Sequence, residues 1–167
     1  MTTRTDYTDA EWDLLTDLPR MAAFGAMAAE EGGPVTSTRE LWASMMELAQ
    51  AARTRYPNNT LIQEVTRAIT RPEDDDEMPM TGWKSNSGEE LGAAIVEQTL
   101  ETAPRVREVL ASHAPPEEAA EYTAWVLGIA RAGGQAVRSG LFGLSGEPVT
   151  AAEEQFIKDL SAALGSA

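Results

Sequence analysis

Three Ser/Thr-x-x-Glu sequences stand in front of apolar stretches, and they constrain the fold of this chain more than any other feature. They begin at Thr8, Ser87 and Thr150. In such a capping box the hydroxyl accepts from the backbone N–H three residues later, while the acid reaches back, so each box predicts a helix start. Behind them, apolar residues recur three, four and seven positions apart, as in an amphipathic helix. Val and Ile show no alternating runs, so strands are not expected.

This pattern predicts an all-α fold, a compact bundle of six or seven helices. Pro19 costs a helix one hydrogen bond, so we expect a break near Thr16–Asp17 and a second helix ending near Glu30. Pro104 is expected to kink or split the helix that follows Ser87. The remaining helices are expected at about 36–54, 60–70, 115–137 and 150–165.

The chain has 167 residues, which is the usual size of one domain. We expect residues 1–8 to be an N-terminal tail and residues 9–164 to form a single helical domain. Residues 71–87 hold a run of acids, prolines and glycine, and we expect them to form an acidic loop within that domain.

The charge balance excludes several classes of function. The chain carries 13 basic and 27 acidic residues, a net charge of -14. Nucleic-acid backbones and anionic membrane surfaces both require clustered Lys and Arg, so neither is an expected ligand. A basic partner, a bound cation or solubility alone fits the charge better. The polar N-terminus and the lack of an apolar run near ~20 residues predict a cytoplasmic protein without direct membrane insertion.

Few residues are available for catalysis. There is no Cys, which excludes thiol nucleophiles and thiolate metal sites, and the only His is His113. We expect His113 to cap carbonyls or interact with the dipole at a helix end. Carboxylate pairs could arise anywhere in so acidic a chain. We therefore expect no catalytic residues, and an enzyme with a pocket in the bundle remains the least favoured alternative.

The acidic loop holds the first candidate for partner binding. Its five consecutive acids are Glu73, Asp74, Asp75, Asp76 and Glu77, and Trp83 follows. The run lacks the spacing and glycine of an EF-hand, so a specific Ca²⁺ site is not favoured. It is either a solvated linker or a docking segment for a basic partner. Trp83 either anchors that partner or folds back on the bundle.

A second candidate is the glycine-punctuated stretch at 140–146, which carries Leu141, Phe142 and Leu144. These side chains either pack over the end of the bundle or contact a partner. The leading hypothesis is therefore a non-enzymatic, acidic protein-interaction module. It would dock a basic or amphipathic protein through the acidic loop, Trp83 and this apolar stretch, and the sequence leaves a homo-oligomer open.

Two segments match each other within the chain. Gly32–Trp42 aligns with Gly146–Phe156, and both contain a Gly, a Pro-Val-Thr sequence and the start of an amphipathic helix. The match predicts two pseudo-repeated helical hairpins, unless capping chemistry alone produced it.

The first of these turns, Ala28-Ala29-Glu30-Glu31-Gly32-Gly33-Pro34-Val35-Thr36 followed by Glu40, resembles a family motif. It is similar to the acid–Gly–x–aliphatic–Ser/Thr–x–x–Glu turn of the tellurite-resistance TerB-like proteins. That resemblance implies a small acidic helical bundle that binds a divalent cation and acts in stress-related complexes. The ligands it implies are Glu31 and Glu40, with Glu153 or Glu154 from the second turn. Alternatively, these are surface acids, and Glu40 favours a helix start through the dipole. No other cofactor is expected.

Overall fold

The computed structural model describes residues 1–29, 51–70, 88–138 and 150–166, the side chains of 88–91 and 135–138 excepted. Every regular element in these ranges is a helix, which confirms the all-α prediction. The elements are a 3-10 helix η1 at Arg4–Asp6 and the α-helices α1 Asp9–Ala28, α3 Thr60–Ile69, α4 Gly88–His113, α5 Pro116–Arg138 and α6 Ala151–Ala163. Residues 51–55 are also helical. None of the described helices is both long and apolar enough to cross a membrane.

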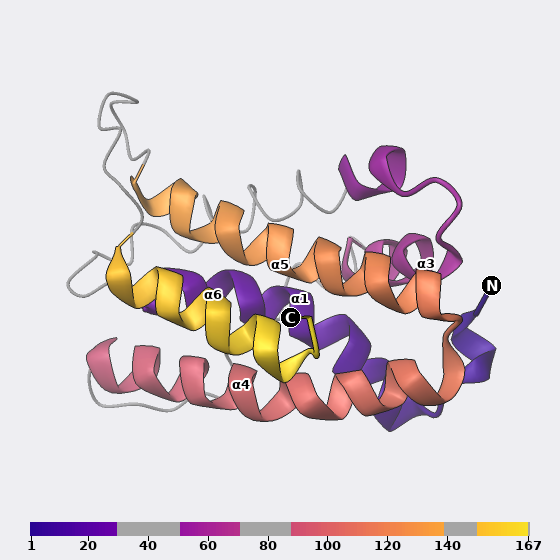
Figure 1. The fold of residues 1–167 in the computed structure, drawn as a ribbon, viewed down its shortest axis with the longest axis horizontal. Helices are drawn as coiled ribbons and strands as arrows, with labels where there is room; N and C mark the ends of the chain where they lie inside the picture. Colours follow the sequence, from indigo (N-terminus) through magenta and orange to yellow (C-terminus); the bar gives the residue numbers. More distant parts are fainter. Residues whose placement is uncertain (30–50, 71–87, 139–149, 167) are drawn as a thin grey trace.

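Helix α1 is the centre of the bundle. It packs most extensively against α4 and α5, and it also contacts α3 and α6. Figure 1 shows α6 in front of α1, between α4 and α5. The core is filled by aliphatic side chains with no exposed surface, among them Leu15, Leu18, Leu61 and Ile62.

Pro19 does not break α1, so the predicted division near Thr16–Asp17 is wrong. The helix runs without interruption from Asp9 to Ala28, with Pro19 buried inside it. Proline has no N–H, which leaves the carbonyl four residues earlier, at Leu15, without its helical donor. The hydroxyl of Tyr122 in α5 donates to that carbonyl at 2.6 Å. A side chain from another helix thus replaces the missing backbone donor.

Pro104 does not split α4 either. The helix is continuous from Gly88 to His113 and contains Pro104. Neighbouring residues Ala103 and Val106 are fully buried in the core. The packing of this face against the bundle favours a continuous helix, and a proline's low helix propensity alone does not account for that packing.

Residues 1–8 are part of the bundle and not a free tail. Thr2 and Tyr7 are buried, at 6% and 5% exposure, around the 3-10 helix η1. The buried carboxylate of Glu118 in α5 accepts from the Thr2 N–H and hydroxyl, both at 3.0 Å, and from the Thr60 N–H at 3.1 Å. Glu118 therefore ties the start of the chain to the starts of α3 and α5. The polar composition of residues 1–8 gives no sign of this packing, because Thr2 is held by hydrogen bonds to Glu118.

Two of the three predicted capping threonines and serines are confirmed as helix caps. At α1, the Thr8 hydroxyl accepts from the Glu11 N–H at 3.3 Å, and the Thr8 N–H donates to the Glu11 carboxylate at 2.8 Å. At α6, the Thr150 hydroxyl accepts from the Glu153 N–H at 3.2 Å. The predicted box at Ser87 lies outside the described residues, as does the segment Gly32–Trp42 of the predicted repeat.

Glycines allow the helices to approach closely. A Cβ added at Gly133 of α5 would lie 2.7 Å from the backbone oxygen of Ala23 in α1. A Cβ added at Gly25 would lie 2.5 Å from the Phe156 ring of α6. The seams between α1 and its neighbours therefore have no room for a methyl group at these positions.

Candidate functional site

The residues predicted to bind a partner lie outside the described part of the chain. This holds for the acids of 73–77, for Trp83, and for Leu141, Phe142 and Leu144. Two of the four predicted cation ligands, Glu31 and Glu40, also lie outside it. The structure places only Glu153 and Glu154, in the first turn of α6.

Glu153 and Glu154 point in different directions. The Glu153 side chain is buried at 1% exposure, and its carboxylate occupies the space where a Cβ on Gly134 of α5 would lie. Glu154 is exposed, and its Oε1 lies 3.1 Å from the Lys158 ammonium one turn later. The two carboxylates therefore do not converge. In the described ranges, no three or more His, Asp and Glu residues come together in a group that could hold a metal ion.

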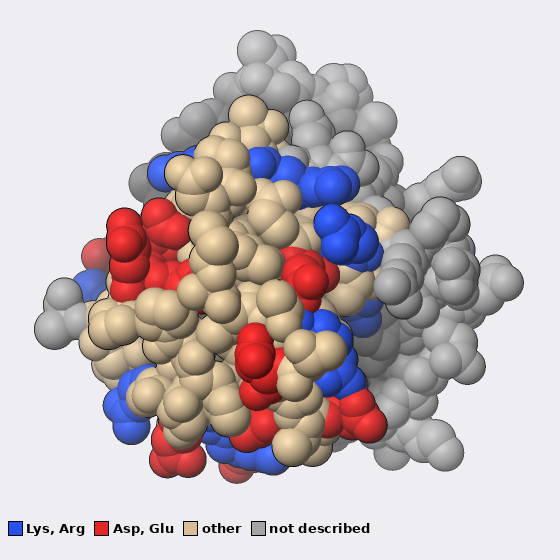
Figure 2. Space-filling model, turned by 90° about the vertical axis from the view of Figure 1, so that its right-hand side faces the viewer, with Lys and Arg blue, Asp and Glu red and all other residues tan. Residues whose placement is uncertain are grey.

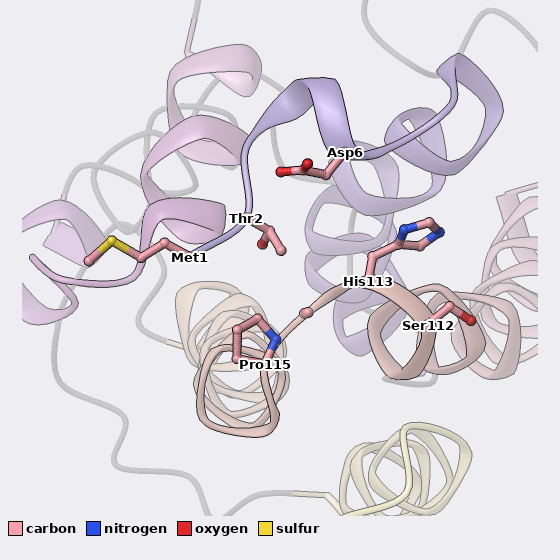
Figure 3. Close-up of a pocket in the computed structure, with 7 residues that line it drawn as sticks. Met1, Thr2, Asp6, Ser112, His113 and Pro115 are labelled. Atoms are coloured by element: carbon pink, nitrogen blue, oxygen red, sulfur yellow. The ribbon is translucent and has the colours of Figure 1, made fainter.

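An open hollow lies where the N-terminal segment meets the connection between α4 and α5. Its volume is about 470 Å³. It is lined by Met1, Thr2, Asp6 and residues 112–115. Figure 3 shows Asp6 and Thr2 on the N-terminal segment, facing Ser112 and His113 at the end of α4 and Pro115 just beyond it. Lys or Arg and Asp or Glu side chains both occur on this end of the molecule (Figure 2). We call this feature the α4-end hollow.

Asp6 contributes a carboxylate to the α4-end hollow. The Thr3 N–H and hydroxyl donate to Asp6 Oδ2 at 2.7 and 3.1 Å. These bonds to the charged form hold the pKa of Asp6 below its usual value. The side chain is exposed and is therefore an anion at neutral pH.

His113 is held at the rim of the hollow by contacts across the bundle. Its Nε2 lies 3.2 Å from Glu11 Oε1, and its ring centroid lies 5.3 Å from that of Tyr7. Hydrogen bonds from the Thr8 N–H and hydroxyl, followed by the contact with His113, lower the pKa of Glu11. His113 is in the last turn of α4, as the sequence predicted. Among the described contacts it pairs with a carboxylate of α1 and not with backbone carbonyls of its own helix, and its position in the last turn fits the expected interaction with the helix dipole.

A second hollow of about 290 Å³ lies on the other side of the Glu11–His113 pair, between α1 and α4. Its lining combines two aliphatic side chains with three charged ones and a serine: Glu11, Leu14, Arg105, Glu108, Val109 and Ser112. Ser112 lines both hollows.

The sequence alone does not show that these residues lie together. Glu11 is fully explained by its capping box, and His113 lies 102 positions later in the chain. Asp6 and Thr2 were assigned to a tail. The one available signal was that Tyr7, an aromatic residue, lies within an otherwise polar start.

Comparison of the chain with family models, with curated proteins and with solved structures gives no match. The described residues form an all-α helical bundle. The TerB-like resemblance stays a prediction from the two turn regions.

Proposed function

We propose that this chain is a non-enzymatic, cytoplasmic protein-interaction module whose partner is a basic or amphipathic protein. The observation that carries the proposal is the net charge of -14, five units of which come from the consecutive acids at 73–77. A concentration of like charge accelerates encounter with an oppositely charged partner and disfavours anionic ones. Nucleic acids are accordingly not among the proposed ligands.

The described surface supports a cationic partner. Glu97, Glu101 and Glu108 of α4 are exposed and lie four and seven positions apart, which puts them on one face of the helix. The exposed Arg105 lies on the same face, so acids remain in excess there. The hollow between α1 and α4 adds aliphatic area from Leu14 and Val109 beside Glu108. An amphipathic basic helix matches both the acids and the aliphatic area, because its apolar side chains and its Lys or Arg side chains both recur at helical spacing.

The first experiment measures binding of a defined probe to the full chain. The probe is a fluorescently labelled Lys/Leu peptide about four helical turns long, with its Leu residues on one face. We expect fluorescence anisotropy to report binding that weakens as salt rises, because exposed charges are screened beyond about 10 Å at 0.1 M. A peptide of the same composition with its Leu residues scattered is the control. If neither peptide binds at low salt, the proposal is wrong.

The second experiment locates the docking segment. One variant neutralises the run by Glu73→Gln, Asp74→Asn, Asp75→Asn, Asp76→Asn and Glu77→Gln. A matched control neutralises five exposed acids elsewhere by Asp13→Asn, Asp17→Asn, Glu117→Gln, Glu154→Gln and Asp159→Asn. Both variants change the net charge by the same amount, so long-range attraction is equal. We expect the first to lose binding and the second to keep most of it. Equal loss would show that overall charge, and not the acidic loop, drives binding.

A further inference from the structure

At the end of α4, two backbone carbonyl oxygens have no donor among the described hydrogen bonds. The last carbonyls of a helix depend on N–H groups beyond its end. The Ala114 N–H donates to the Leu110 carbonyl at 2.9 Å, but residues 115 and 116 are prolines and have no N–H. The carbonyls of residues 111 and 112 therefore lack a donor four positions ahead. The negative end of the α4 dipole lies at the α4-end hollow.

The α4-end hollow is also lined by a carboxylate and by an apolar ring. Asp6 is an anion, and the hydrogen bonds it accepts from described residues both reach Oδ2. The ring of Pro115 lines the same hollow, across from Asp6 in Figure 3. Long cationic side chains bind best where a charged end meets acceptors and the methylene stem lies along apolar surface.

Two groups near the hollow that can carry positive charge each lie beside another acid. The amine of Met1 lies 3.7 Å from Glu118 Oε2, and the His113 ring faces Glu11. Besides the hydrogen bonds from Thr3, both lower the pKa of the Asp6 carboxyl through space. Neither forms a hydrogen bond or an ion pair with Asp6 among the described residues, so Asp6 Oδ1 has no described donor.

We infer that the α4-end hollow receives an ammonium or guanidinium side chain of the basic partner, between the Asp6 carboxylate and the carbonyls that end α4. This inference rests on the proposed function and adds a specific contact to it. The partner would therefore carry a Lys or Arg that projects beyond its apolar face.

The test locates the bound Lys/Leu peptide on the full chain by NMR. We expect the amide resonances of Thr2, Asp6 and Ser112 to shift on titration. The imidazole resonances of His113 should shift too, and their assignment is unambiguous because the chain has one His. Binding that shifts resonances elsewhere but not these would overturn the inference while leaving the proposed function intact. Absence of any binding contradicts both.

A pair of variants tests the charge itself. Asp6→Asn removes the charge and keeps an oxygen that can accept from Thr3, so η1 is expected to persist. We expect this variant to bind the peptide about two- to fivefold more weakly, as for one partly exposed ion pair. Asp159→Asn removes an exposed acid of α6 outside both hollows and should leave the affinity unchanged. Equal weakening by both variants would overturn the inference.

Discussion

The hydroxyl of Tyr122 donates to the backbone carbonyl of Leu15 at 2.6 Å, the carbonyl that Pro19 deprives of its own helical donor. Both groups are buried, Tyr122 completely. An unpaired buried carbonyl carries a substantial desolvation cost. One side chain of α5 therefore permits a proline inside α1 and at the same time fixes the two helices against each other.

Removing that hydroxyl should destabilise the bundle. We expect Tyr122→Phe to lower the free energy of unfolding by about 1–3 kcal/mol, because the Leu15 carbonyl loses its donor while buried. Urea unfolding measures the change. Tyr56→Phe is the control, since the half-buried Tyr56 hydroxyl makes no hydrogen bond among the described residues. In a Pro19→Ala background the backbone supplies a donor again, so the cost of Tyr122→Phe should shrink. An unchanged cost in that background would contradict the proposed compensation.

Close approach of α1 and α5 depends on Gly133. Its added Cβ would meet backbone atoms of Ala23, at 2.7 Å from the oxygen and 3.1 Å from Cα, and backbone cannot swing aside as a side chain can. We expect Gly133→Ala to destabilise the protein by about 1–3 kcal/mol through overpacking. Gly128 lies in the same helix, is exposed and has nothing within 4 Å of its added Cβ. Gly128→Ala should instead stabilise by up to about 1 kcal/mol through helix propensity. Thermal unfolding of the two variants should therefore shift in opposite directions.

Stability should fall in acid through the carboxylates at the N-terminal end. Hydrogen bonds from Thr3 lower the pKa of Asp6, and hydrogen bonds from Thr8, followed by His113, lower that of Glu11. A carboxyl whose pKa is lower in the folded state binds its proton more readily when unfolded. Its contribution is therefore complete above its ordinary pKa, 3.8 for Asp6 and 4.5 for Glu11, and disappears as pH falls through the lower folded value. Urea titrations from pH 6 to 3 should show a smaller loss for Glu11→Gln than for the wild type. Parallel curves would contradict the assignment.

The helix starts could be predicted because their causes are local. Thr8 and Glu11 are three residues apart, and so are Thr150 and Glu153, so the sequence alone contains the interaction. Continuity through Pro19 could not be predicted, because the compensating donor lies 107 positions away. The packing of residues 1–8 was missed for the same reason. Its main acceptor, Glu118, is 116 positions from Thr2 and is indistinguishable from its acidic neighbours in the sequence.

The candidate site shows the same limit. The sequence identified His113 as a residue at a helix end, which is correct, but not that Glu11 and Tyr7 would meet it there. Glu153 appeared equivalent to Glu154 because they are adjacent. Helical geometry places consecutive side chains about 100° apart, so one is buried against Gly134 and the other is exposed.

Cation binding, the alternative that follows from the TerB-like resemblance, makes its own prediction. If Glu31 and Glu40 hold a divalent cation, millimolar Mg²⁺, Ca²⁺, Mn²⁺ or Zn²⁺ should raise the Tm, because a ligand of the native state stabilises it, by about 2.7 kcal/mol at 100 times Kd. Glu31→Gln combined with Glu40→Gln should remove that rise. Glu154→Gln should not, since Glu154 is an exposed partner of Lys158. No increase in Tm with any of the four metals would contradict cation binding.

Substitution of Trp83 distinguishes docking of a partner from packing of this side chain on the bundle. As an anchor for the partner, it should behave like the aromatic residues that dominate interfaces, for which truncation costs 2 kcal/mol or more, or about 30-fold in affinity. We expect Trp83→Ala to weaken binding of the Lys/Leu peptide on that scale without changing the Tm of the free protein. Trp83→Phe, which keeps an aromatic ring, should retain most of the affinity. If Trp83 instead folds back on the bundle, Trp83→Ala lowers the Tm and leaves the affinity of the remaining folded protein unchanged, because a buried aromatic stabilises the fold and not the complex.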